Sequence, residues 1–349
     1  EDAPELDTLV VPIGGGGLIS GISAVAKAQD RDITVIGVPL TAITNSTYTD
    51  PRQRQLFKNI ICLGVFLAFR ASQALGTAGF GFFWKQSWEP DANNFGIAAV
   101  LVGTIIIALV AVTIALPLSL GTALYISEYA PRQLRQTLIT LVDLMAAIPS
   151  VVFGLWGFFS LQGSIIDVAK WISRTFGWIP IFTVDGFSDD PLSSDTVFTA
   201  SSFIAGIVVA MMITPIMTSI MREVFSQAPI GEREGALGLG ATMWGMIRSV
   251  VLPFGKGGII GGTMLGLGRA LGETIAVYMI ISPVFTIQPH ILQSGASSIS
   301  SLIALKYGEA TTFGMSALMA AGLALFFVTL VVNFGASAIV ARSRSGASS

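Results

Sequence analysis

Charged residues are scarce in this chain of 349 residues, because Asp, Glu, Lys and Arg together make up only 11% of it, against about 25% in an ordinary soluble domain. Its one cysteine, Cys62, excludes a disulfide framework and a cysteine metal cluster. Its one histidine, His290, argues against a histidine metal site or a catalytic triad. The net charge of −2 comes without a basic tract, so nothing indicates nucleic-acid binding. The sequence also has no G-x-x-x-x-G-K-[ST] motif, so the chain does not hydrolyse ATP through a P-loop.

The chain contains long apolar runs. Hydrophobic residues make up 52% of it, and the mean hydropathy is +0.75. They form six blocks, at about 56–75, 96–126, 137–160, 199–221, 257–283 and 313–340. A membrane helix needs about 20 apolar residues, and five blocks reach that length. The first block is short and contains Lys58 and Arg70, so the sequence leaves its insertion open. The prediction is an all-α transmembrane fold with six helices, the first possibly truncated.

The distribution of Lys and Arg predicts the orientation in the membrane. Thirteen of the nineteen basic residues flank the blocks on one side and four on the other. Basic residues favour the cytoplasmic side. We therefore expect a multi-pass protein of the cell membrane with both termini and the loop 222–256 in the cytoplasm, and with the loop around 161–198 outside.

The first 38 residues differ in character from the rest. They predict a strand at Thr8–Ile13, a glycine turn, a helix at about 18–29 and a strand at Ile33–Val38, a short βαβ-like soluble fragment. Residues 39–55 are polar and contain Pro39 and Pro51, which predicts a linker. The membrane domain is then expected over 56–349.

The loop 222–256 is charged, yet it keeps apolar residues at helical spacing. Gly240 in its middle predicts two short helices with a bend between them. An amphipathic hairpin of this kind offers a rigid knob to a partner protein. EGALGLG at 234–240 and VVLP at 250–253 resemble the coupling motif of ABC importer permeases, with Gly235 and Val250 as mild departures. The resemblance implies that Glu234, Gly235, Ala236, Gly240, Leu252 and Pro253 dock on a separate cytoplasmic ATPase.

The fifth block contains GLGRALGETIAV at 266–277, which places Arg269 and Glu273 inside an apolar helix. A charge at the centre of a membrane helix costs about 2.5–3.5 kcal/mol on insertion scales. Four residues apart, the two side chains are expected to share a helix face. Two interpretations stay open: a self-neutralising structural pair, or a substrate pathway in which the guanidinium meets an oxyanion.

The same block resembles the permeases of bacterial phosphate ABC importers, in which G-R-A-x-G-E-T is typical, and its continuation into AV favours the PstC-type subunit. EYAP (128–131), IPSVVFGLWG (148–157) and YGEA (307–310) extend the resemblance over about 60–340. It implies that Arg269 and Glu273 take part in phosphate transport. It also implies a PstA-type second permease, a PstB-type ATPase homodimer that binds ATP and Mg, and a PstS-type phosphate-binding protein, with no cofactor on this chain. The alternative is a permease for another oxyanion such as sulfate, molybdate or phosphonate.

Residues 6–38 resemble pyridoxal-phosphate enzymes of the threonine dehydratase and serine racemase type, whose tetraglycine loop holds the cofactor phosphate. Gly14, Gly15, Gly16 and Gly17 would be that loop. The Schiff-base lysine of those enzymes lies upstream, and this chain has no such lysine, so we expect a non-functional remnant joined to the permease by fusion or by an artefact. A pyridoxal-phosphate lyase or racemase is the rival hypothesis for function.

Two further expectations concern packing. Gly258, Gly262 and Gly266 repeat every four residues, as do Gly257 and Gly261, which predicts close helix packing, with the second permease as the suggested partner. Glu128 at the end of the second block is expected to anchor the membrane interface or to pair with Arg132.

Overall fold

The computed structural model describes residues 8–13, 34–39, 51–185 and 195–345. Within these ranges, six stretches are helical, long and apolar enough to cross a membrane: Ile60–Phe83, Ala98–Tyr129, Ser150–Phe176, Ser202–Ser226, Met243–Leu271 and Thr312–Gly335. The prediction of an all-α transmembrane fold with six helices is confirmed.

The first and last long helices pair with each other. Helix α3 (Pro51–Ala78) lies along α14 (Thr312–Ser345), and the hydroxyl of Ser316 donates to the carbonyl oxygen of Arg70 at 2.7 Å. The linker was predicted to end at residue 55 and the first block to begin at residue 56, which places the start of this helix too late. Helix α3 starts at Pro51, and proline suits the first position of a helix. With its apolar stretch running to Phe83, the first helix is long enough to span.

The main core is built by α4 (Ala98–Leu124), α8 (Ser202–Ser226) and α11 (Leu252–Leu271). Small residues let these helices approach closely: a Cβ on Gly258 would lie 2.6 Å from Val224, and one on Gly266 would lie 2.6 Å from Met217. The predicted packing role of the glycine repeat is confirmed. For Gly258, Gly262 and Gly266 the partner is α8 of this chain, so the suggestion that they face a second permease was wrong, whereas a Cβ on Gly257 or Gly261 would meet nothing within 4 Å.

The third apolar block is broken where the sequence analysis expected one helix over 137–160. The chain forms α5 (Arg132–Ala147), leaves the helix at Ile148–Pro149, and resumes as α6 (Ser150–Trp156) and α7 (Gln162–Phe176). Proline disfavours helical geometry at the residue before it, and Ile148 is extended with ψ of 129°. The spanning stretch is therefore Ser150–Phe176, and α5 is a separate amphipathic helix whose residues are all at least partly exposed.

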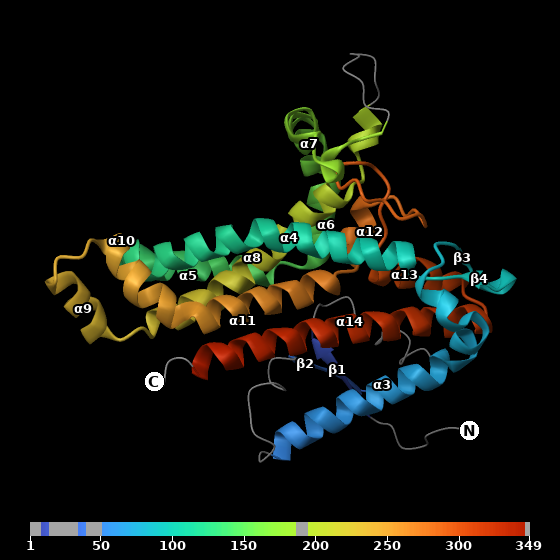
Figure 1. Cartoon of the computed structure of the whole chain (residues 1–349), viewed down its shortest axis with the longest axis horizontal. Helices are drawn as coiled ribbons and strands as arrows, with labels where there is room; N and C mark the ends of the chain where they lie inside the picture. Colours follow the sequence, from blue (N-terminus) through green and yellow to red (C-terminus); the bar gives the residue numbers. More distant parts are fainter. Residues whose placement is uncertain (1–7, 14–33, 40–50, 186–194, 346–349) are drawn as a thin grey trace.

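Figure 1 shows how the ends of the bundle are organised. Helices α9 (Ile230–Gly238) and α10 (Met243–Met246) lie at the left end, on the side where α14 ends and α3 begins. The antiparallel pair β3 (Trp88–Glu89) and β4 (Asn94–Phe95) lies at the opposite end with α13 (Ile299–Lys306). Helices α9 and α10 thus lie on the same side as the start of α3 and the end of α14.

The two predicted N-terminal strands are present. β1 (Thr8–Ile13) and β2 (Thr34–Pro39) pair in parallel, with Thr8 opposite Thr34 and Ile13 opposite Pro39. The parallel pairing agrees with the predicted βαβ-like order. The helix expected at 18–29 and the glycines at 14–17 lie outside the described residues.

Candidate functional site

A helix break lies in the middle of the fifth apolar block. Helix α11 ends at Leu271, Gly272 caps it, and α12 (Ile275–Ile280) begins after Thr274. Arg269 is therefore on the last turn of α11, whereas Glu273 is in the break. The expectation that the two share a helix face was wrong, because the helix ends between them. In the part of the chain that the structure describes, no ion pair joins Arg269 to Glu273.

Glu273 is buried inside the bundle, with 4% of its surface exposed. Its Oε1 accepts a hydrogen bond from the backbone N–H of Ala276 at 3.5 Å, and the side chain of Ser150 lies close to the carboxylate. Ser150 begins α6, which packs against α12 so closely that a Cβ on Gly154 would lie 2.9 Å from Cα of Ala276. A charged side chain is thus held where two short helices meet.

A layer of buried hydroxyls adjoins this break. Ser300 donates to the backbone carbonyl oxygen of Glu273 at 2.6 Å, and Thr104 of α4 accepts from the backbone N–H of Ile299 at 2.9 Å. Ser298 caps α13 in a reciprocal pair with Ser301. The layer consists of Thr104, Thr274, Ser297, Ser298, Ser300 and Ser301, each at most 5% exposed. The sequence analysis missed it, although the run SGASSISS at 294–301 is unusually polar for its apolar surroundings.

Two polar atoms near the break have no partner among the described residues. Arg269 Nε and Ser297 Oγ are buried without a hydrogen bond. A buried donor left unpaired costs free energy, and such a donor is a group that an anion could satisfy. Among the described residues, no cluster of three His, Cys, Asp or Glu could hold a metal ion. A guanidinium and hydroxyls are groups that can donate hydrogen bonds to an anion.

The segment 222–256 forms the predicted bent pair of helices. α9 ends at Gly238, Gly240 has a φ of +87°, and α10 starts with Thr242 accepting from the N–H of Gly245 at 3.1 Å. A φ in this region favours glycine. The bend predicted at Gly240 is confirmed.

The six residues predicted to couple to an ATPase differ in their exposure to solvent. Glu234, Gly235 and Gly240 are exposed. Ala236 and Leu252 pack against the main core instead. Pro253 does not end the helix, because a π-helical turn at Ile247–Val251 precedes it and the helical stretch continues to Leu271. Leu239, which the sequence analysis did not single out, is 91% exposed and extends the outward face.

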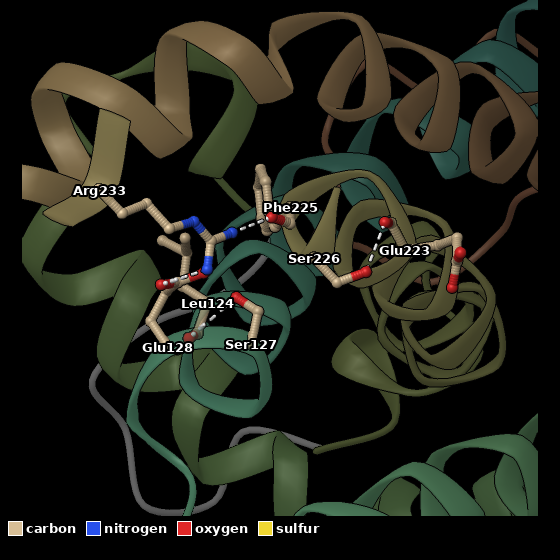
Figure 2. A network of polar contacts seen from close by, with 7 residues as sticks. All are labelled: Leu124, Ser127, Glu128, Glu223, Phe225, Ser226 and Arg233. Atoms are coloured by element: carbon tan, nitrogen blue, oxygen red, sulfur yellow. Dashed lines mark hydrogen bonds and ion pairs between the residues drawn. The ribbon is translucent and has the colours of Figure 1, made fainter. Parts of the chain in front are cut away.

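Glu128 pairs with Arg233 of α9, and the expected pairing with Arg132 was wrong. Glu128 Oε2 accepts from Arg233 Nη1 at 3.3 Å. Figure 2 shows the guanidinium pointing at both Glu128 and the carbonyl group of Phe225. The two charged residues are 105 positions apart in the sequence, so local spacing could not reveal the pair.

Comparisons with known proteins identify the family of this chain. The family described as "Binding-protein-dependent transport system inner membrane component" matches residues 115–345. The phosphate transport system permease protein PstC of Pasteurella multocida strain Pm70 is 40% identical over 76% of this chain and 81% of its own length. PstC 2 of Mycobacterium tuberculosis is 37% identical over 82% and 88%, and PstC of Mesorhizobium japonicum is 36% identical over 88% and 92%. An inward-facing structure of the MetNI methionine ABC transporter aligns over 69% of this chain and 93% of its own, with 15% identity and a TM-score of 0.47.

Proposed function

Because this chain belongs to the binding-protein-dependent transport system inner membrane components, we propose that it is the permease subunit of an ATP-driven importer of inorganic phosphate. The proposal that the substrate is phosphate rests on the identity of 36–40% to permeases named for phosphate transport. A permease for another oxyanion is the alternative, since the Arg269 guanidinium by itself would suit several tetrahedral anions.

Arg269 and Glu273 are the residues we assign to the substrate pathway. The Nε of Arg269 is buried and unpartnered among the described residues, so an entering phosphate would satisfy a donor that already lacks an acceptor. Charged groups inside a membrane bundle usually face a polar pathway or a partner. Glu273 stands beside the hydroxyl layer and would keep the local charge balanced while the site is empty. The pathway is half of a larger one, which a second permease would complete.

Glu234, Gly235, Ala236, Gly240, Leu252 and Pro253 are assigned to ATPase coupling. The exposed side of α9 and the bend at Gly240 would dock on the partner, while Ala236 and Leu252 pass its movement to the core. ATP and Mg would bind at that partner, and this chain would need no cofactor. The full assembly we propose contains a PstA-type permease, a PstB-type ATPase homodimer and a PstS-type phosphate-binding protein.

The proposed setting is the inner membrane of a bacterium, with both termini in the cytoplasm. The distribution of Lys and Arg supports this orientation. The start of α3 and the end of α14 lie at the same end of the bundle as α9, as an ATPase-facing side requires (Figure 1).

The N-terminal fragment is proposed to be a remnant of a pyridoxal-phosphate enzyme without its activity. The parallel β1–β2 pair is in accord with that origin, but a single βαβ-like piece buries too little surface to be stable alone. Purified protein should therefore show no absorbance band near about 410–430 nm from a Schiff base. Such a band would favour the lyase or racemase hypothesis.

The proposed substrate is tested in proteoliposomes that contain the complete transporter and its binding protein. ATP-driven uptake of radiolabelled phosphate should be blocked by excess unlabelled phosphate and persist in excess sulfate or molybdate. Uptake that sulfate or molybdate abolishes, with transport of that anion instead, would replace phosphate by the alternative oxyanion.

A further inference from the structure

Arg233 connects three elements at the end of the bundle where α9 lies. It projects from α9, donates through Nη1 to Glu128 Oε2 at 3.3 Å, and donates through Nη2 to the carbonyl oxygen of Phe225. Glu128 lies on the π-helical turn Tyr125–Tyr129 that follows α4. Phe225 is on the last turn of α8, where carbonyl groups lack helical partners and attract a cation.

Apart from Arg233, α9 contacts the described structure through Ala236, the π-helical turn Ile247–Val251 and α10. The structure describes all nine of its residues, and none of them is buried. Ala236 provides its contact with the main core. A helix of this length is marginal without tertiary contacts. The guanidinium of Arg233 is therefore the principal polar attachment between α9 and the membrane helices.

The pair is shielded from water, unlike a common surface ion pair. The side chain of Glu128 is 3% exposed and that of Arg233 is 19% exposed. An interaction between charges strengthens as the local dielectric falls. Removing one partner of a buried pair leaves the other charge uncompensated, which is costly. Breaking this attachment is thus costly.

The pair also uses only part of its bonding capacity. Among the described residues, Glu128 Oε1 and Arg233 Nε are both buried without a hydrogen-bond partner. Arginine and a carboxylate can form two parallel hydrogen bonds. A small displacement of α9 relative to α4 could close the second bond, so the pair has a more strongly bonded arrangement open to it.

The far part of α4 reaches the hydroxyl layer. Thr104 near the start of α4 accepts from the N–H of Ile299, and a Cβ on Gly103 would lie 2.1 Å from the carbonyl oxygen of Ser297. One continuous helix therefore connects the turn that carries Glu128 to the loop beside Glu273. A displacement applied at Glu128 has a continuous helical route, through Pro117 of α4, to the buried polar layer.

We propose that the Glu128–Arg233 ion pair is the link that carries movement of α9 into α4 and α8, and that it closes into a two-bond fork in one state of the transport cycle. The inference rests on the proposed function, in which α9 contacts the ATPase. Arg233 is then a positioning residue: it touches neither substrate nor nucleotide, and its effect passes through α4 and α8. A merely structural attachment would lower phosphate uptake and ATP hydrolysis together.

The test uses the complete reconstituted transporter and measures phosphate imported per ATP hydrolysed. Glu128→Gln, Arg233→Gln and the double variant form a cycle. Each single variant should lower that ratio about 5- to 150-fold, the usual range of allosteric coupling, and the double variant should be no worse than the more damaging single one. Arg233→Lys should also lower the ratio with normal assembly, because an ammonium lacks the fork that bridges a carboxylate and a carbonyl. It replaces Arg233→Gln if that variant does not assemble.

The matched control is Lys306→Gln, which breaks the exposed pair with Glu309 at 3.1 Å in the opposite part of the bundle. The amount of phosphate that Lys306→Gln imports per ATP hydrolysed should equal that of the wild type. The proposal is overturned if wild-type complex imports phosphate while the three single variants keep the wild-type ratio, or if the two losses simply multiply in the double variant. Failure of the wild type to import phosphate would instead contradict the proposed function.

Discussion

The hydroxyl of Ser300 on α13 donates a 2.6 Å hydrogen bond to the backbone carbonyl oxygen of Glu273, in the break between α11 and α12. Both residues are buried. A carbonyl that leaves a helix inside an apolar bundle has no water to bond with. The bond to Ser300 therefore stabilises the break and fixes the place of Glu273.

Replacing Ser300 by alanine should remove this support. A buried carbonyl left unsatisfied costs about 1–3 kcal/mol, so Ser300→Ala should lower the thermal unfolding midpoint of the purified transporter and slow phosphate uptake. Ser72→Ala is the control, because Ser72 donates to Phe69 O at 2.7 Å in an exposed position. Equal midpoints for the two variants would show that the bond does not hold the break.

Glu273→Gln distinguishes the two interpretations of the charged residues in the fifth block. Glutamine keeps the shape and an oxygen that can accept from the N–H of Ala276, but it removes the charge. If Glu273 balances Arg269 along the substrate pathway, uptake should fall at least severalfold while the unfolding midpoint changes little. A large loss of stability with uptake preserved per folded transporter would favour the purely structural pair. Uptake and thermal unfolding are measured on the same preparations.

Two glycines one turn apart should respond differently to a methyl group. A Cβ on Gly258 would lie 2.6 Å from Val224, whereas one on Gly261 would meet nothing within 4 Å. Overpacking costs about 1–3 kcal/mol, and glycine to alanine inside a helix gains about 0.5–1 kcal/mol. Gly258→Ala should therefore destabilise this chain and Gly261→Ala should not, by thermal unfolding of the isolated subunit. Equal destabilisation by both would contradict the packing of α11 on α8.

Gly240→Val should impair coupling to the ATPase, because valine strains the backbone at the bend. The φ of +87° is strained for a β-branched residue, at about 1–2 kcal/mol for left-handed geometry. We expect less ATPase to co-purify and less phosphate to be imported per ATP. Gly238→Ala is the control, because Gly238 is helical and a Cβ there meets nothing within 4 Å. A normal ratio in Gly240→Val would show that the bend does not shape the docking face.

The sequence predicted those features that depend on local chemistry. Apolar length predicted six spanning helices, although the third lies at Ser150–Phe176 and the fifth at Met243–Leu271. Gly240 marked the bend because few other residues adopt a positive φ. It did not predict the break at Ile148–Pro149, although Pro149 was a visible signal, because average hydropathy runs across the break unchanged. It also extended the helix from Arg269 through Glu273, since apolar residues continue on both sides of Gly272.

Contacts between distant segments could not be predicted in this way. Ser300 meets Glu273 across 27 positions, and Arg233 meets Glu128 across 105. Both depend on how helices pack, which spacing along one helix does not encode. The buried hydroxyl layer was not predicted because a run of serines such as that at 294–301 is also typical of an exposed loop.

Arg269→Gln tests the proposed function most directly. ATP-driven phosphate uptake and ATP hydrolysis are measured together in proteoliposomes that contain the complete transporter, with wild type and variant at equal assembly. Loss of a charge-assisted contact to the anion should cut uptake about tenfold or more, while the ATPase still docks and hydrolyses ATP. Wild-type uptake by Arg269→Gln would contradict the assignment of the substrate pathway to this residue.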